Sequence, residues 1–460
     1  MQEKINWNNC YSPMRFGEDI ARFDERSVYE RDYDRIIFSS AFRRLQNKTQ
    51  VFPLPERVFV HNRLTHSLEV VSVGRSLGMM VGERLAELPE IKENPRSVQF
   101  YQDQLKAVIS AACLAHDLGN PAFGHSGEEA ISKYFLDRQN DQGFRSAFKP
   151  GEWEDLTHFE GNANALRILT KQFNGRLKGG YQITYTTLAS ILKYPCESLA
   201  RDKSQGKHRS KFGYFQSDAE VFDKVIKEFG MLEDSRTPRA YFRHPFVYLV
   251  EAADDICYSI IDYEDAHRLG ILSFAEVRDD LMALIEADGK SDMSRLRQNL
   301  ETLREDKNES VAYLRAKAIT ALVNRCADSF IENREAILRG QFKTSLIDSL
   351  ADLKQALSII EKKSIGKIYN HESVVKIELA GFKIMSGLIE DLVEAVLISE
   401  DQAQKRHSKI LSLIPSQYKF ASGASPYEKV MTVLDYVSGM TDNYALELYR
   451  NLRGISVPAV

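Results

Sequence analysis

Apolar residues recur at helical spacing along nearly the whole chain, and the strict alternation typical of half-buried strands is rare. Leu68, Val71, Leu77 and Val81 predict one apolar face of a helix over residues 66–88. Similar patterns predict further helices over residues 104–118, 127–138, 160–174, 183–194, 217–230, 246–268, 373–399 and 426–452. We therefore expect an all-α fold.

Three stretches depart from the helical pattern. Residues 50–60 (QVFPLPERVFV) predict at most a short β-hairpin that bends at its prolines. Residues 139–157 and 195–215 are polar and contain Gly, Lys and Ser, which is typical of loops. The chain shows no internal repeat and no low-complexity tract.

Composition narrows the class of protein. Apolar residues make up 43% and charged residues 27% of the 460 residues, as in ordinary globular proteins, and a net charge of -4 gives no general attraction to nucleic acid. Five scattered cysteines without a CxxC pair fit a reducing compartment. The N-terminus has no apolar signal region, and no apolar run is long enough to cross a bilayer, so we expect a cytoplasmic protein without membrane contact.

Candidate metal chemistry begins with His116 and Asp117, which are adjacent at the end of a predicted helix. Imidazole and carboxylate together form a mixed ligand set that suits Mn, Fe, Ni or Mg better than a closed zinc site. A His-Asp pair alone is common by chance. Asp254 and Asp255 add weight because they lie in an otherwise apolar helix, where an unpaired buried carboxylate costs several kcal/mol. A cation beside one of them would remove that cost.

Asp254, Tyr258 and Asp262 are spaced four residues apart and so form one polar stripe on their helix. The stripe could line a ligand pocket or pack against a neighbouring helix. If it lines a pocket, Asp254 rather than Asp255 faces the ligand.

The segment HSGEEA supplies acid–base candidates. Ser126 and Glu129 have the spacing of a capping box, which would leave His125, just outside the cap, and Glu128 free to face a site. A histidine beside a bound phosphate can transfer protons near neutral pH. The alternative is that His125 is an ordinary surface residue.

Several segments in one order resemble the deoxyguanosinetriphosphate triphosphohydrolase family of the HD superfamily. They are RRLQNKTQVFP, NRLTHSLEV, AHDLGNPAFGHSGEEAI, HFEGNANALRIL, LKYP and EAADDICYSIIDYEDA, which together cover residues 41–266, and ELAGFKIMSGLIE resembles the C-terminal region of the family. One departure is Asn164, where the family more often has Gln.

The resemblance implies a role for each matching residue. The metal ligands would be His66, His116, Asp117 and Asp254. His125 would be the catalytic histidine and Glu128 its supporting carboxylate. Gln50 and Asp262 would hold the deoxyribose 3′-hydroxyl, and Tyr258 would pack against the sugar and exclude a 2′-hydroxyl. The phosphate-binding residues would be Arg63, Lys193, Tyr194 and Lys211.

The implied reaction is metal-dependent hydrolysis of a deoxynucleoside triphosphate, with dGTP foremost, to deoxynucleoside and tripolyphosphate. One divalent ion is expected, Mn or Mg first, with Fe, Ni or Co as alternatives. An HD phosphodiesterase or 5′-nucleotidase would use the same ligands, and a non-catalytic dNTP-sensing or DNA-binding regulator would keep the pocket without turnover.

The resemblance also implies an organisation for the chain. Residues 1–60 would be an N-terminal helical segment with the hairpin, residues 61–270 the HD-domain core, and residues 271–460 a C-terminal helical region that packs on the core. Family members form homo-oligomers, commonly hexamers, and can bind single-stranded DNA weakly. The basic loop at 201–211 could contact such DNA, but it lacks interleaved aromatic residues, so triphosphate contact through Lys211 is preferred.

Overall fold

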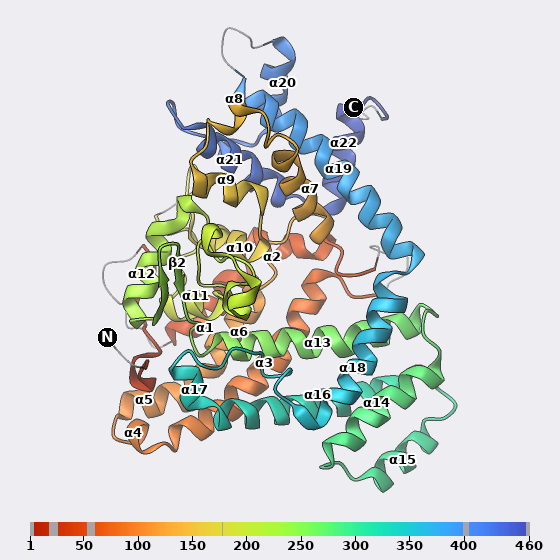
Figure 1. Cartoon of the computed structure of the whole chain (residues 1–460). Coiled ribbons are helices and arrows are strands. Elements are labelled where there is room, and N and C mark those ends of the chain that lie inside the picture. Colours follow the sequence, from red (N-terminus) through yellow and green to blue (C-terminus); the bar gives the residue numbers. More distant parts are fainter. Residues whose placement is uncertain (1–3, 18–25, 53–59, 177, 399–403, 457–460) are drawn as a thin grey trace.

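The computed structural model describes residues 4–17, 26–52, 60–176, 178–398 and 404–456 and is built almost entirely of helices (Figure 1). The first half contains α1 (Val28–Ile37), α2 (Ser40–Arg44), α3 (Arg63–Ala86), α4 (Pro89–Lys92), α5 (Pro95–Gln99), α6 (Leu105–Ala115), α7 (His125–Leu136), α8 (Gln142–Arg145), α9 (Pro150–Thr157), α10 (Gly161–Thr170), α11 (Tyr185–Ile191) and α12 (Ala219–Phe229). The second half contains α13 (Val247–Arg268), α14 (Phe274–Asp288), α15 (Met293–Thr302), α16 (Lys307–Glu332), α17 (Arg334–Leu338), α18 (Lys354–Lys363), α19 (Glu372–Leu397), α20 (Lys405–Leu413), α21 (Pro426–Ser438) and α22 (Asp442–Leu452). The predicted all-α class is confirmed.

Helix α3 lies at the centre of the larger hydrophobic core, against α6, α13 and α16. Gly74, Gly78 and Gly82 recur every four residues on its face toward α6 and the turn before it. A Cβ atom at Gly82 would lie 2.1 Å from the carbonyl oxygen of Tyr101, so only glycine permits this approach. The close packing brings the start of α3, which carries His66, next to the end of α6, where His116 follows. Both histidines are predicted metal ligands.

A second hydrophobic core joins helices distant in sequence, with α7 and α9 packed against α19 and α21. Figure 1 shows α19 running along one side of the molecule past α7. The C-terminal helices therefore pack around the segment that follows His116. The predicted domain boundaries at residues 60 and 270 stay predictions.

The predicted helix positions hold with three corrections. Leu68 was placed on the apolar face of α3, but its side chain is 39% exposed. The single helix expected over 426–452 is two helices, because the chain turns at Gly439 and Thr441 caps a new start. The loop expected over 139–157 contains α8 and α9, and Trp153 on α9 is buried among aromatic side chains.

The described residues contain one two-stranded sheet that the pattern did not predict. Strands β1 (Glu233–Arg236) and β2 (Arg239–Tyr241) pair antiparallel, with Glu233 opposite Tyr241 and Arg236 opposite Arg239. The hairpin predicted at 50–60 lies largely outside the described residues, although Thr49 and Asn62 form an isolated antiparallel bridge beside it. Residues 195–215 are irregular apart from single helical turns, as predicted.

None of the helices in the described part of the chain combines the length and the apolar character needed to span a bilayer.

Candidate active site

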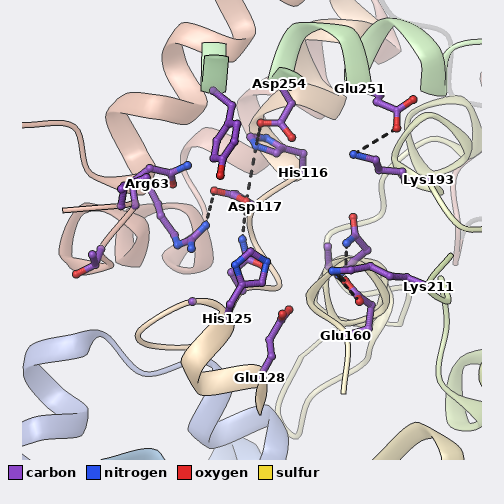
Figure 2. Close-up of a pocket in the computed structure, with 18 of the residues that line it drawn as sticks. Arg63, His116, Asp117, His125, Glu128, Glu160, Lys193, Lys211, Glu251 and Asp254 are labelled. Carbon is purple, nitrogen blue, oxygen red and sulfur yellow. Dashed lines mark hydrogen bonds and ion pairs between the residues drawn. The ribbon is translucent and has the colours of Figure 1, made fainter. Parts of the chain in front are cut away.

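A cleft of about 480 Å³ opens between α3, α7, α10, α13 and the start of α19. This volume lies within the usual range for small-molecule sites. All but two of the predicted site residues line the cleft (Figure 2). The two exceptions are His66 and Asp262, which are buried.

Three of the four predicted metal ligands converge on one point, where His116 and Asp254 of the cleft lining meet the buried His66. His66 lies on α3, His116 directly follows α6, and Asp254 lies on α13. One ligand atom from each lies within 4.8 Å of the other two. Oδ1 of Asp254 is 3.2 Å from Nε2 of His66 and 3.5 Å from Nε2 of His116. Two imidazoles and a carboxylate are therefore available to a single divalent ion.

His116 supplies a direct test of whether these residues fit a metal ion. Its Nδ1 donates a hydrogen bond to the carbonyl oxygen of Cys113 at 2.6 Å, and its buried Nε2 has no hydrogen-bond partner among the described residues. Burial opposes protonation of the ring, but the carboxylates of Asp117 and Asp254 outweigh it and raise the pKa of His116 to about 9. The two carboxylates therefore attract positive charge to this nitrogen, and the donor set fits a divalent cation.

Asp117 stands slightly apart from the other three predicted ligands. Its Oδ1 is 3.7 Å from Nε2 of His116 and accepts a hydrogen bond from Asn120 at 2.5 Å. Its Oδ2 accepts a hydrogen bond from Arg63 at 2.8 Å. Asp117 is thus next to the cluster but held by two donors, and its role as a ligand stays a prediction.

The predicted capping box at Ser126 is wrong. Helix α7 begins at His125, with Gly124 at the N-cap position and no capping side chain. Gly124 has φ of 56°, which glycine adopts readily, so the chain enters helical geometry earlier than the sequence pattern suggested. His125 is therefore the first residue of the helix, and it lines the cleft.

Glu128 lies one turn after His125 and also lines the cleft. Its Oε1 accepts a hydrogen bond from the backbone N–H of Gly161 at 2.8 Å, which joins α7 to the start of α10. Burial, followed by the negative charge of Glu160, raises the pKa of Glu128 to about 7. Loss of water contacts inside the cleft, together with the charges of Lys211 and Arg63, lowers the pKa of His125. Glu128 can therefore change its protonation state near neutral pH.

The three predicted phosphate-binding cations each have a carboxylate partner in the cleft wall. Arg63 pairs with Asp117, Lys193 with Glu251 at 3.4 Å, and Lys211 with Glu160 at 3.0 Å. Figure 2 shows the lysines on the side of the cleft facing His125 and Glu128. Tyr194 also lines this wall.

The sequence interpretation missed both lysine partners. Glu251 precedes Asp254 by three residues and so shares its helical face, which was a usable signal. Glu160 caps α10 through the backbone N–H of Asn162, and its place beside Lys211 arises only from tertiary packing.

The far end of the cleft is aromatic. The rings of Tyr258 and Tyr369 stack at 5.4 Å between centroids, and the hydroxyl of Tyr369 donates to Asp262 at 3.1 Å. Burial raises the pKa of Asp262 to about 7. Of the predicted stripe, Tyr258 lines the cleft and Asp262 lies behind the lining, hydrogen-bonded to the lining residue Tyr369. Nothing in the sequence indicated a role for Tyr369. Nearby in the lining, the buried Oε1 of Gln50 has no hydrogen-bond partner among the described residues.

Comparisons with known proteins identify two matching domain families and several full-length relatives. Residues 63–184 match the HD domain family, and residues 348–451 match the family described as the phosphohydrolase-associated domain. A deoxyguanosinetriphosphate triphosphohydrolase-like protein of Synechocystis is 38% identical over 98% of this chain and 100% of its own length. A protein of the same name from Pseudomonas aeruginosa is 36% identical over 99% of this chain and 100% of its own length.

A more distant relative is named as the enzyme itself, without the ending "-like protein". The deoxyguanosinetriphosphate triphosphohydrolase of Yersinia pseudotuberculosis is 29% identical over 98% of both chains. The residues of the cleft, the two domain matches and the full-length similarity lead to one assignment. The chain belongs to the deoxyguanosinetriphosphate triphosphohydrolase-like family of HD-domain hydrolases.

Proposed function

We propose that this protein hydrolyses deoxynucleoside triphosphates, dGTP foremost, to the deoxynucleoside and tripolyphosphate. The observation that carries the proposal is the arrangement of the cleft, where three cations and a His125–Glu128 pair surround the His66–His116–Asp254 cluster. A monophosphate would not need Lys193 and Lys211 as well as Arg63. The names of the relatives support dGTP as the preferred substrate.

The resident cofactor in this proposal is one divalent ion, Mn or Mg, held by His66, His116 and Asp254 together with Asp117. Such an ion supplies Lewis-acid polarisation of a phosphate oxygen and lowers the pKa of a water molecule.

The cations orient the substrate. Arg63, Lys193 and Lys211 would neutralise the triphosphate through charge-assisted hydrogen bonds. Their carboxylate partners hold them in the cleft wall at 2.8 to 3.4 Å. The cations are therefore ordered before substrate arrives, and less side-chain entropy is lost on binding.

His125 moves the proton. As a water oxygen bonds to the α-phosphorus, the bond from phosphorus to the 5′-oxygen breaks, and His125 donates a proton to that oxygen. Glu128 supports the charged form of His125, because a carboxylate nearby favours the imidazolium.

The aromatic end would take the sugar. Gln50 offers a buried acceptor that has no partner among the described residues, and Asp262 together with Tyr369 offers a second polar contact for the 3′-hydroxyl. Tyr258 would pack on the sugar where a 2′-hydroxyl would project.

Two further proposals concern partners. Exposed Ile359, Ile365 and Leu379 near α18 and α19 support association of several copies of the chain, which light scattering would measure. In the basic loop at 201–211, Lys207 pairs with Asp348 and Arg209 with Asp234. Because these two cations are already paired, the loop offers less positive charge to a nucleic-acid backbone. We therefore favour triphosphate capture by Lys211 over binding of single-stranded DNA.

Incubation with each of the four dNTPs and Mn²⁺, followed by separation of the products, tests the proposed function. We expect deoxynucleoside and tripolyphosphate, with the highest rate for dGTP. Orthophosphate as the sole phosphate product would instead indicate a nucleotidase, and tight dGTP binding without turnover would indicate a sensor.

A further inference from the structure

Asp442, at the start of α22, ties together two chain segments that carry active-site residues. Its Oδ2 accepts hydrogen bonds from the backbone N–H of Thr49 at 2.8 Å and from the Thr49 hydroxyl at 2.6 Å. Its Oδ1 accepts a hydrogen bond from the backbone N–H of Phe123 at 2.9 Å. Thr49 immediately precedes Gln50, and Phe123 lies two residues before His125. One buried carboxylate therefore spans the two loops.

Lys48 and Asn164 reinforce the same connection. The ammonium of Lys48 donates to the carbonyl oxygens of Asn120 at 2.5 Å and Ser438 at 2.8 Å. The amide of Asn164 donates to the carbonyl oxygen of Gly119 at 2.7 Å and to the hydroxyl of Ser438 at 3.2 Å. Residues 48–49 and 119–123 are thus both bonded to the turn between α21 and α22, which we call the 438–442 junction.

The loop held by the junction has an unfavourable backbone. Phe123 has φ of 61°, a left-handed conformation that costs a side-chain-bearing residue roughly 1–3 kcal/mol. Such a conformation persists only where its surroundings enforce it. Here Asp442 holds the Phe123 N–H, and the ring packs where a Cβ on Gly381 of α19 would lie 2.5 Å away. The junction therefore helps to maintain the backbone that leads into His125.

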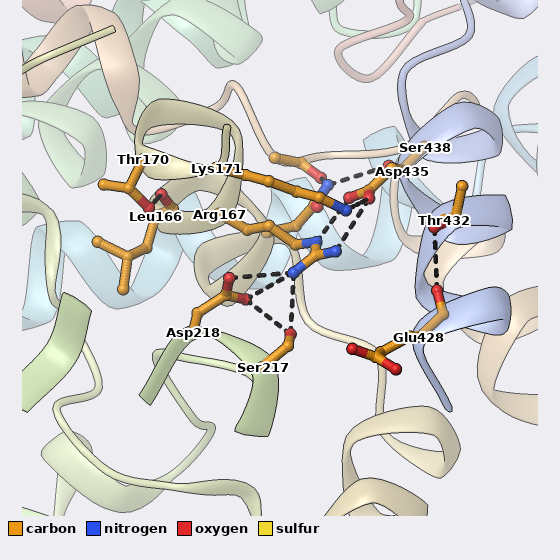
Figure 3. Close-up of polar contacts among 12 residues, drawn as sticks. Leu166, Arg167, Thr170, Lys171, Ser217, Asp218, Glu428, Thr432, Asp435 and Ser438 are labelled. Atoms are coloured by element: carbon orange, nitrogen blue, oxygen red, sulfur yellow. Dashed lines mark hydrogen bonds and ion pairs between the residues drawn. The ribbon is translucent and has the colours of Figure 1, made fainter. Parts of the chain in front are cut away.

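The junction is itself anchored. Asp435, one turn before Ser438 on α21, accepts two hydrogen bonds from Arg167 of α10, at 2.6 and 2.9 Å, and also pairs with Lys171. Arg167 pairs in addition with Asp218 (Figure 3). This buried charge network fixes α21 to α10, so the helix that leads into the junction is itself held in place.

We propose that Asp442 is a positioning residue of the active site, which sets the sugar contact at Gln50 relative to the proton donor His125. This inference rests on the proposed function, because it takes Gln50 as a contact of the 3′-hydroxyl. A carboxylate with acceptors for both loops is needed, and an amide in its place offers only one oxygen.

The test compares Asp442→Asn with Glu447→Gln, which changes an exposed carboxylate on the same helix. For each protein, kcat/KM is measured with dGTP and with 2′,3′-dideoxyGTP, which lacks the 3′-hydroxyl, and thermal unfolding checks that the protein is folded. We expect Asp442→Asn to lower kcat/KM for dGTP about 100-fold, as displacements of about 1 Å can do. The preference for dGTP over the dideoxy analogue should shrink with it, whereas Glu447→Gln should change neither quantity.

A second variant guards against a folding defect. Thr49→Val removes only the hydroxyl contact with Asp442 and keeps the backbone one, so we expect a smaller loss of the same preference. An equal loss of kcat/KM on both substrates, with the preference for dGTP intact, would overturn the inference. That pattern is expected when a smaller fraction of the protein is folded and active. Unchanged kinetics in Asp442→Asn would overturn it too. A wild-type protein that does not hydrolyse dNTPs would instead refute the proposed function.

Discussion

The imidazole Nδ1 of His116 lies 2.6 Å from the carbonyl oxygen of Cys113, and this contact determines the role of the other ring nitrogen. A carbonyl oxygen can only accept, so Nδ1 carries a proton and the neutral ring has its lone pair on Nε2. That nitrogen is buried, lies 3.5 Å from Oδ1 of Asp254, and has no hydrogen-bond partner in the part of the chain that the structure describes. In most metal-binding histidines, the ring nitrogen that does not bind the metal donates a hydrogen bond of this kind, which fixes the orientation of the ring.

Asp254→Ala should lose bound metal and activity, whereas Asp255→Ala should retain the metal. Asp254 lies within 3.5 Å of both histidines, and Asp255 is not part of that cluster. Metal content after dialysis against Mn²⁺, measured by mass spectrometry, separates the two variants. Equal metal loss in both would show that the polar stripe does not select Asp254.

His125→Ala should keep metal and substrate binding but lose about 100-fold or more in kcat, the contribution typical of a general acid. His158→Ala is a matched control, since His158 pairs with Glu154 and does not line the cleft. Single-turnover rates with Mn²⁺ and dGTP provide the measurement. Turnover as fast as in the control would remove His125 from the mechanism.

Glu128→Gln should stabilise the metal-free protein at pH 8 but not at pH 4. Burial and Glu160 raise the pKa of Glu128 from 4.5 to about 7. A carboxyl with a raised pKa stabilises the fold fully below its unfolded pKa, and that stability is lost as pH rises from 4.5 through about 7. Glutamine cannot ionise, so the variant avoids this loss, which corresponds to about 3 kcal/mol at pH 8.

Urea unfolding at the two pH values, in the presence of a chelator, measures the change at Glu128. Glu129→Gln changes an exposed neighbour and should have little effect at either pH. A gain of equal size at pH 4 and pH 8 would mean that ionisation of Glu128 is not its cause.

Tyr258→Ala should raise kcat/KM for GTP relative to dGTP by about tenfold, the discrimination that close packing can provide. Tyr369 stacks on Tyr258 and fixes its ring in the cleft wall. Steady-state kinetics with both nucleotides test this. A ratio that does not change would place the 2′ side of the sugar elsewhere.

Local sequence signals predicted much of the fold. The helix predicted over residues 246–268 from its apolar spacing is α13, which the structure places at Val247–Arg268. The break at Gly439 was missed because apolar spacing continues across it, with Met440 buried on the far side. Leu68 shows the converse, since an apolar residue at helical spacing can still face outward.

The candidate site also contains residues that the sequence indicated and residues that it could not indicate. Residue type and spacing pointed to His116, Asp254 and His125, because their chemistry is unusual in the segments that contain them. Glu160 and Tyr369 could not be predicted in this way, because each reaches the site through a contact with a distant residue. Glu160 contacts Lys211, 51 positions away, and Tyr369 contacts Asp262, 107 positions away. Asn164, noted only as a departure from the family pattern, donates hydrogen bonds to Gly119 and to Ser438 of the 438–442 junction.

Hydrolysis of dGTP in ¹⁸O-labelled water tests the central claim most directly, because it reports which bond this cleft breaks. Water attack at the α-phosphorus, with protonation of the 5′-oxygen by His125, predicts label in tripolyphosphate and none in deoxyguanosine. Label in orthophosphate, or in the deoxyguanosine hydroxyl, would contradict the account.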